Sequence, residues 1–266
     1  MVFNVIMGIV MVVSFVGMIF CAKKQHVKPA AKPAAVGLLV LVVICAIAML
    51  VRNMGDSEGE TILQEEMQFV KSSGVITGKK IAELFPGQQV LVIAGQPIKS
   101  SERNKYFMEG LQEGFGSSAI KYVVPDVTIP KELQNPDMPE AAMGVTEYMT
   151  SKDFNKVLND NKSCKVVLSM IGLPADPAGV KLWNDFKKHP KTCQKLILYC
   201  PGIEKMAPYI HQGLVPFIVT YKMDAISNKP ISDSDQENFD TRYILVDKTN
   251  LVSMVKKYKY LFNLPK

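Results

Sequence analysis

Residues 88–95 read QQVLVIAG, a continuous apolar run that ends in glycine. A strand that is buried on both faces has this pattern, because helices cover both faces of a parallel sheet. The next segment, residues 101–116, has the apolar spacing of an amphipathic helix, and Ser101 is its expected N-terminal cap. A buried strand followed at once by a helix is the first unit of an α/β fold.

The same alternation continues to the end of the chain. The further apolar runs are residues 121–128 (KYVVPDVT), 165–172 (KVVLSMIG), 195–200 (KLILYC), 215–222 (VPFIVTYK) and 242–247 (RYILVD). Strands that alternate with helices form a parallel sheet with right-handed crossovers. We therefore predict a doubly wound α/β fold with the flavodoxin-like strand order 2-1-3-4-5, and with residues 242–247 added at an edge.

Two uncharged apolar runs precede this domain, at residues 2–21 and 34–51. Each is long enough to cross a bilayer core of about 30 Å as a helix. Residues 22–33 between them carry lysines and no acid, which favours a cytoplasmic loop. We predict a transmembrane hairpin over residues 1–52 in a bacterial-type inner membrane, with the N-terminus and the C-terminal domain extracytoplasmic. A cytoplasmic main domain is the alternative.

Residues 53–87 are predicted to form a helical linker or stalk. Residues 56–73 are acidic with a narrow apolar stripe, and a short helix at residues 78–85 is stopped by Pro86 and Gly87. Residues 88–266 are then the extracytoplasmic α/β domain. The formal net charge of +6 is concentrated in the hairpin loop, which leaves residues 53–266 nearly neutral and argues against a nucleic-acid partner.

Known catalytic and metal-binding motifs are missing from the sequence. His26, His189 and His211 are far apart, and none has a second ligand at metal-binding spacing. The chain has no Gly-x-Ser-x-Gly, no Gly-x-x-x-x-Gly-Lys, and no Gly-x-Gly-x-x-Gly after the first strand. We predict no metal, no cofactor and a domain that is not an enzyme.

The carboxyl ends of the predicted strands define the place for a small-molecule site. Ligands of open α/β sheets bind there, at the switch point of the strand order. The candidate ligand-binding residues are Gln96, Asp126, Asp176 and Tyr221. Asp176 has an alternative role as the cap of the helix that is expected near residue 178.

Two cysteines lie at matching positions before neighbouring strands. Cys164 precedes residues 165–172, and Cys193 precedes residues 195–200. Adjacent parallel strands would place both cysteines about 5 Å apart, so we predict a Cys164–Cys193 disulfide in an oxidising compartment if the strands are in register. The alternative is that both are small buried residues that stay reduced.

A family resemblance is carried by three short segments. Residues 90–95 (VLVIAG) and 106–116 (YFMEGLQEGFG) resemble the first strand and helix of type I periplasmic substrate-binding proteins, and residues 210–219 (IHQGLVPFIV) are similar to a helix–glycine–strand step of that family. The resemblance covers residues 88–222 and implies one α/β lobe. Members of the family hold ligand between two lobes, whereas this chain has room for one, so their ligand residues are not carried over.

Two functional hypotheses follow from the sequence. In the first, the chain is a membrane-anchored scaffold or partner-binding component of a cell-envelope complex, with lipids and an envelope protein as partners. In the second, it is a single-lobed solute-binding or sensor protein. A polar pocket at the strand ends would favour solute binding, and a flat or apolar exposed surface would favour the scaffold. A degenerate enzyme is a third alternative.

Overall fold

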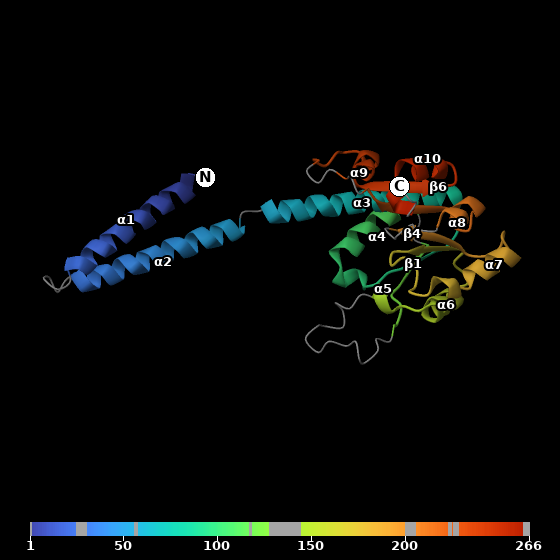
Figure 1. The fold of residues 1–266 in the computed structure, drawn as a ribbon, viewed down its shortest axis with the longest axis horizontal. Coiled ribbons are helices and arrows are strands. Elements are labelled where there is room, and N and C mark those ends of the chain that lie inside the picture. The colour runs from blue at the N-terminus through green and yellow to red at the C-terminus, as the bar shows by residue number, and fades with distance from the viewer. Residues whose placement is uncertain are drawn as a thin grey trace. The chain divides into compact units, whose positions relative to one another are not determined.

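The computed structural model describes residues 2–24, 31–55, 58–116, 119–127, 145–199, 206–222, 225 and 229–262. The chain divides into two compact units, Met1–Gln64 and Glu65–Lys266 (Figure 1). Each unit is described by itself.

The first unit contains two long helices, α1 (Val2–Lys24) and α2 (Ala31–Gly55), which pack against each other. Ser14 and Cys45 are buried, whereas many larger apolar side chains, such as Val13, remain exposed. Within the residues whose side chains are described, no helix is both long enough and apolar enough to cross a membrane. The transmembrane hairpin therefore stays a prediction.

The second unit is built on one six-stranded sheet in the order β2-β1-β3-β4-β5-β6. The strands are β1 (Val90–Ile93), β2 (Ile120–Val123), β3 (Val166–Ser169), β4 (Lys195–Tyr199), β5 (Phe217–Tyr221) and β6 (Tyr243–Asp247). The first five are parallel, and β6 pairs antiparallel with β5 at the edge. The predicted α/β fold, its strand order and its edge strand are thus confirmed.

Helices cover both faces of the sheet, so alternate residues of each strand enter two separate cores. Val90 and Val92 belong to a core with α3 (Glu58–Leu84), α4 (Glu102–Phe115) and α9 (Asp235–Arg242). Leu91 and Ile93 belong to a second core with α6 (Ser151–Asp160), α7 (Leu182–Lys188), α8 (Ala207–Gln212) and α10 (Leu251–Lys257). A short helix, α5 (Val145–Tyr148), and three 3-10 turns, η1 (Ile98–Ser100), η4 (Pro177–Gly179) and η5 (Lys259–Phe262), complete the described elements.

Helix α3 is one continuous helix, so the prediction of two helices in this region was wrong. The reason is its contact with α4, where four glycines bring the two backbones together. A Cβ at Gly74 would lie 2.3 Å from the Phe107 carbonyl oxygen, and one at Gly110 would lie 2.0 Å from that of Lys71. Close packing on the glycine face offsets the low helix propensity of glycine. We call Gly74, Gly78, Gly110 and Gly114 the glycine seam.

Polar contacts also join α3 to the sheet and to α9. The Ser73 hydroxyl donates to the Val70 carbonyl and accepts, at 2.7 Å, from the buried Tyr199 hydroxyl of β4. Ser72 donates to Asp235 on α9 at 2.8 Å. From Glu65 onward α3 is therefore part of the α/β unit, although the sequence places this stretch in a linker.

Candidate functional site

The carboxyl end of β1 is tied to β2 by a cluster of hydrogen bonds. The carbonyl oxygen of Gln96 accepts from the Tyr122 hydroxyl at 2.5 Å and from the Asn104 amide at 3.2 Å. Burial raises the pKa of Tyr122, while the hydrogen bond with Asn104 opposes that rise. The backbone of Gln96 thus fixes the loop after β1, and its side chain is exposed.

Asp176, another predicted ligand residue, has its hydrogen-bond partners on α6. The Asp176 carboxylate accepts from the Ser151 backbone N–H at 2.5 Å and from the Ser151 hydroxyl at 2.6 Å. These bonds lower the pKa of Asp176 and hold the first turn of α6. Asp176 stands at the N-cap position of the 3-10 turn η4, as the alternative prediction has it, but its side chain makes no capping hydrogen bond there.

Tyr221 and Asp126 are both exposed. The Arg103 guanidinium lies 5.3 Å from the centre of the Tyr221 ring, and Tyr221 packs on Tyr243 at 4.9 Å. At the switch point between β1 and β3, a Cβ at Gly95 would lie 3.3 Å from Ile171. Residues 128–144, 200–205 and 226–228, which follow β2, β4 and β5 in the sequence, lie outside the described residues.

The predicted disulfide is absent from the structure, where Cys164 and Cys193 are free thiols. The register required for it is present, because both cysteines lie two residues before the paired residues Val166 and Lys195. The two sulfurs, however, have different partners. Cys164 is buried with its Sγ 3.3 Å from the Gln89 side-chain oxygen, and Cys193 Sγ lies 3.7 Å from the Pro190 carbonyl.

One concave surface lies along the free edge of β6. This groove has a volume of about 470 Å³ and is bounded by α3, α9, β6 and the α10 region. We call it the β6-edge groove. Its floor includes the buried rings of Phe239, Tyr243 and Tyr258. Its rim carries four lysines and two acids, namely Lys79, Lys80, Lys222, Lys257, Glu83 and Asp240.

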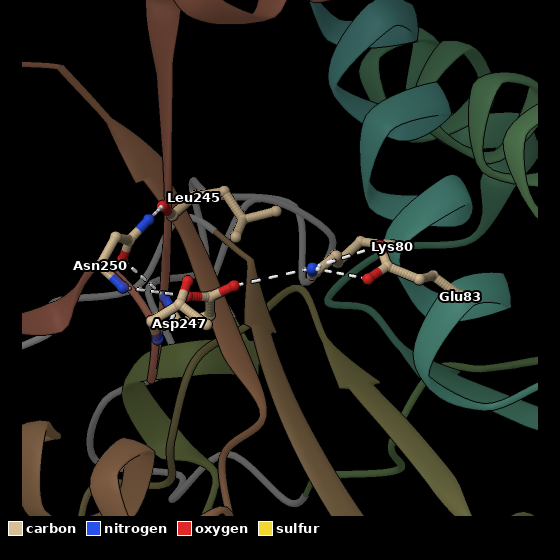
Figure 2. Close-up of polar contacts among 6 residues, drawn as sticks. Lys80, Glu83, Leu245, Asp247 and Asn250 are labelled. Atoms are coloured by element: carbon tan, nitrogen blue, oxygen red, sulfur yellow. Dashed lines mark hydrogen bonds and ion pairs between the residues drawn. The ribbon is translucent and has the colours of Figure 1, made fainter.

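A polar network joins residues that line this groove to Asp247 (Figure 2). The Lys80 ammonium lies 3.2 Å from the Glu83 carboxylate and 3.7 Å from that of Asp247, and so links α3 to the end of β6. Burial raises the pKa of Asp247, but hydrogen bonds from Thr249 and the nearby Lys80 charge outweigh burial, and the pKa lies below its ordinary value. The Asp247 carboxylate is therefore ionised at neutral pH.

The side chain of Asn250 occupies part of the free edge of β6. Its amide donates to the Leu245 carbonyl at 2.8 Å and accepts from the Asp247 N–H at 2.9 Å (Figure 2). It thereby takes the place of a neighbouring strand at these two residues. Unpaired edge groups invite pairing with other chains, so Asn250 protects this edge.

A second concave surface lies at the amino ends of β3 and β4, and we call it the amino-end pocket. Its volume is also about 470 Å³. Lys165, Lys191 and Lys195 line it together with apolar residues from the end of α3. None of its lining residues is acidic. Among the described residues, no cluster of three or more His, Cys, Asp or Glu side chains is arranged to hold a metal ion.

Comparisons with known proteins give similarity to solved structures alone. No family model matches the chain, and no curated protein matches it. The chain is similar to a glucose-galactose binding protein from Geobacillus stearothermophilus, with 11% identity, 68% of this chain and 61% of that chain covered, and a TM-score of 0.41. The resemblance to periplasmic substrate-binding proteins is thus confirmed.

Two further structures show the same level of similarity. An arabinose binding protein from Geobacillus stearothermophilus has 14% identity, covers 69% of this chain and 62% of its own, and gives a TM-score of 0.42. A periplasmic solute binding protein of an ABC transporter from Actinobacillus succinogenes, with bound D-allose, has 14% identity, coverage of 71% and 62%, and a TM-score of 0.40. This chain spans about three fifths of each of these proteins, and TM-scores this low support no inference about ligand.

Sequence reasoning missed both concave surfaces. The β6-edge groove combines side chains from α3 with others more than 130 positions later in the sequence. Helix α9, which supplies Phe239 and Asp240, was not predicted at all. The sequence DQENFDTR of α9 has only one large apolar residue, so it lacks an amphipathic stripe. The signal that could have revealed it is Ser234 followed three residues later by Glu237, a pattern typical of a helix start.

Proposed function

We propose that the chain is a membrane-anchored, non-catalytic α/β domain that binds a protein partner of the cell envelope at the β6-edge groove. The observation that carries the proposal is the groove itself, with an aromatic floor, a lysine-rich rim and the one antiparallel edge of the sheet. The three aromatic rings are almost fully buried and form the base of the groove, so contact with a partner would come from exposed side chains of the rim, such as Lys79 and Lys257. Lys80 is paired with Glu83 and Asp247, which leaves Lys79, Lys222 and Lys257 against Asp240 on the rim, so we expect the partner to present an acidic segment.

The anchor is proposed from the two helices of the first unit. Residues 2–21 and 34–51 are uncharged, and apolar side chains such as Val12 (64% exposed) and Val13 (65% exposed) face outward. Exposed apolar side chains in such numbers need a non-aqueous or protein environment. The lysines of residues 22–33 support a location of the α/β unit outside the cytoplasm, because basic loops favour the cytoplasmic side of a membrane.

The topology is tested with single cysteines at Gln25 and Ser57 in a chain that lacks its own accessible thiols. A membrane-impermeant thiol reagent added to intact spheroplasts is expected to label the cysteine at Ser57 but not the one at Gln25. The reverse pattern would place the α/β unit in the cytoplasm. Equal labelling of both positions, together with recovery of the protein in the aqueous fraction rather than with the membranes, would contradict the proposed membrane anchor.

Partner binding is tested by site-specific photocrosslinking in intact membranes. A photoreactive residue at Lys79, on the rim of the groove, is expected to give a discrete crosslinked product. The matched control is Lys156, an exposed lysine on α6 outside the groove. Charge reversal at a second rim position, Lys257→Glu, should remove the product from Lys79. The groove would be refuted as the docking site by equal amounts of crosslinked product from Lys79 and Lys156. It would also be refuted if the product from Lys79 persisted in the Lys257→Glu variant.

A second candidate function is solute binding at the carboxyl ends of the strands. It is favoured by the strand order, which places a switch point between β1 and β3. Glucose, arabinose and allose serve as the first small polar probes of this site. A sugar that raises the melting temperature of the wild type, but not that of Asp126→Ala, would support this function over the scaffold.

A further inference from the structure

We propose that the amino-end pocket binds a phosphate or carboxylate group that carries a short apolar chain. The pocket lies at the amino ends of β3 and β4 and shares no lining residue with the β6-edge groove. The proposal therefore goes beyond partner binding and does not depend on it.

The charge of the pocket selects an anion. Lys165, Lys191 and Lys195 contribute three positive charges, and no acidic residue lines the pocket to balance them. Lys195 is held in place, because its ammonium donates to the Pro190 carbonyl at 2.7 Å and lies 4.6 Å from the Phe186 ring. Lys165 and Lys191 are exposed, and neither ammonium has a recorded ion-pair partner within the described part of the chain. A bound anion would relieve the repulsion among these lysines.

The walls of the pocket select an apolar chain. The end of α3 contributes Leu84, and the turn that follows contributes Phe85 and Pro86. Leu84 is 39% exposed, so a large apolar side chain meets solvent beside the lysines. The volume of about 470 Å³ falls within the range of small-molecule sites, about 300–1,000 Å³. Inorganic phosphate alone would leave most of this space, including the apolar wall, in contact with water.

Cys193 provides a reporter inside the pocket. Burial raises the pKa of its thiol, although the neighbouring Lys195 charge opposes the rise. The thiol is therefore neutral near pH 7 and adds no negative charge that would repel an anion. Because its side chain is only partly buried, a soluble alkylating reagent can reach it. A molecule in the pocket should shield it.

The direct test is calorimetric titration of the purified full-length protein with hexyl phosphate, inorganic phosphate and 1-hexanol. Hexyl phosphate is expected to bind saturably and more tightly than either of the other two probes. The double substitution Lys165→Gln/Lys191→Gln should weaken that binding about tenfold, equivalent to about 1.4 kcal/mol. The control, Lys187→Gln/Lys188→Gln, makes the same charge change on exposed lysines of α7 that do not line the pocket, and should leave the affinity within about twofold of the wild type.

A second readout locates the binding site. Saturating hexyl phosphate is expected to slow alkylation of Cys193 by N-ethylmaleimide at least severalfold, with no slowing by hexanol. Equal loss of affinity in both double variants, or unchanged Cys193 alkylation, would overturn the pocket as the site. Binding of inorganic phosphate as tight as that of hexyl phosphate would overturn the apolar part of the proposal.

A third experiment, with lipid vesicles, distinguishes a lipid headgroup from a soluble molecule as the natural ligand. Vesicles of phosphatidylcholine with phosphatidic acid compete for hexyl phosphate binding if the natural ligand is a lipid headgroup. If only free hexyl phosphate protects Cys193, the ligand is a soluble molecule. Binding to the vesicles without any binding of hexyl phosphate would show general attraction to an anionic surface and would overturn the pocket.

Discussion

Replacement of Gly110 by alanine should destabilise the α/β unit through the glycine seam. The added Cβ would lie 2.0 Å from the Lys71 carbonyl oxygen, 2.9 Å from its carbonyl carbon and 3.0 Å from the Val75 nitrogen. Real Cβ atoms essentially never approach closer than 3.0 Å, so α3 and α4 must separate by about 1 Å. The obstacle is backbone, and no change of side-chain rotamer can relieve it.

The expected magnitude combines two opposing effects. Overpacking of a closely packed interior costs about 1–3 kcal/mol. Replacing glycine by alanine inside a helix recovers about 1 kcal/mol. Because a backbone clash belongs at the upper end of the first range, we expect a net loss of about 1–2 kcal/mol. For a domain of this size, this corresponds to a melting temperature about 2–8 °C lower.

Thermal unfolding of the purified full-length protein, followed by near-ultraviolet circular dichroism, measures this loss. The matched control is Gln112→Ala, which truncates an exposed side chain on the same helix and should change the melting temperature by little. Gly74→Ala, on the opposite side of the seam, should behave like Gly110→Ala. If Gly110→Ala were as stable as the wild type, the reasoning from backbone contact would be refuted.

Three further predictions follow from individual contacts. Asn250→Ala removes two hydrogen bonds at the edge of β6 and should lower the free energy of unfolding in urea by about 1–2 kcal/mol. Because the strand edge is then unprotected, the variant should also aggregate and scatter more light on heating. Unchanged scattering would contradict the protective role of Asn250. The pKa of Asp176 is lower in the folded state than in the unfolded state, where it is about 3.9, so the ionised carboxylate stabilises the fold above that pH, and this stabilisation is lost as pH falls through the folded pKa. Asp176→Asn should therefore be less stable than the wild type at pH 7, and the difference should shrink below about pH 4. A stability difference that does not depend on pH would count against this contribution. Mass spectrometry without reductant should find Cys164 and Cys193 alkylated, the buried Cys164 more slowly, whereas a crosslinked peptide would show that the disulfide forms.

The strands of the sheet could be predicted because the residues that identify each strand are consecutive in the sequence. The strands are short and mostly apolar, as at Val90–Ile93 (VLVI) and Val166–Ser169 (VVLS), and all four residues of both strands are buried. The parallel order follows from the intervening helices and the handedness of the crossovers. Ser101 was identified as a helix cap for the same reason, since its side chain accepts from the N–H of Asn104, only three residues away.

The remaining features depend on contacts that are distant in the sequence. Gly74 and Gly78 weaken a helix by local propensity, and only the partner glycines of α4 show why the helix continues. Asp176 is a plausible ligand by its place after β3, but its carboxylate is engaged by Ser151, 25 residues earlier. Lys80, on the rim of the β6-edge groove, likewise pairs with Asp247, and no local sequence pattern predicts that pairing.

The continuity of α3 has a mechanical consequence. A pull transmitted through residues before Glu65 acts on a helix that shares its backbone contacts with α4 and a buried hydroxyl pair with β4. Tension along the helix axis would load the seam in shear, so several contacts would have to fail together before α3 could slide. Such a geometry resists extension better than an attachment that peels away one contact at a time. The unit would therefore keep its fold under tension that would straighten a linker.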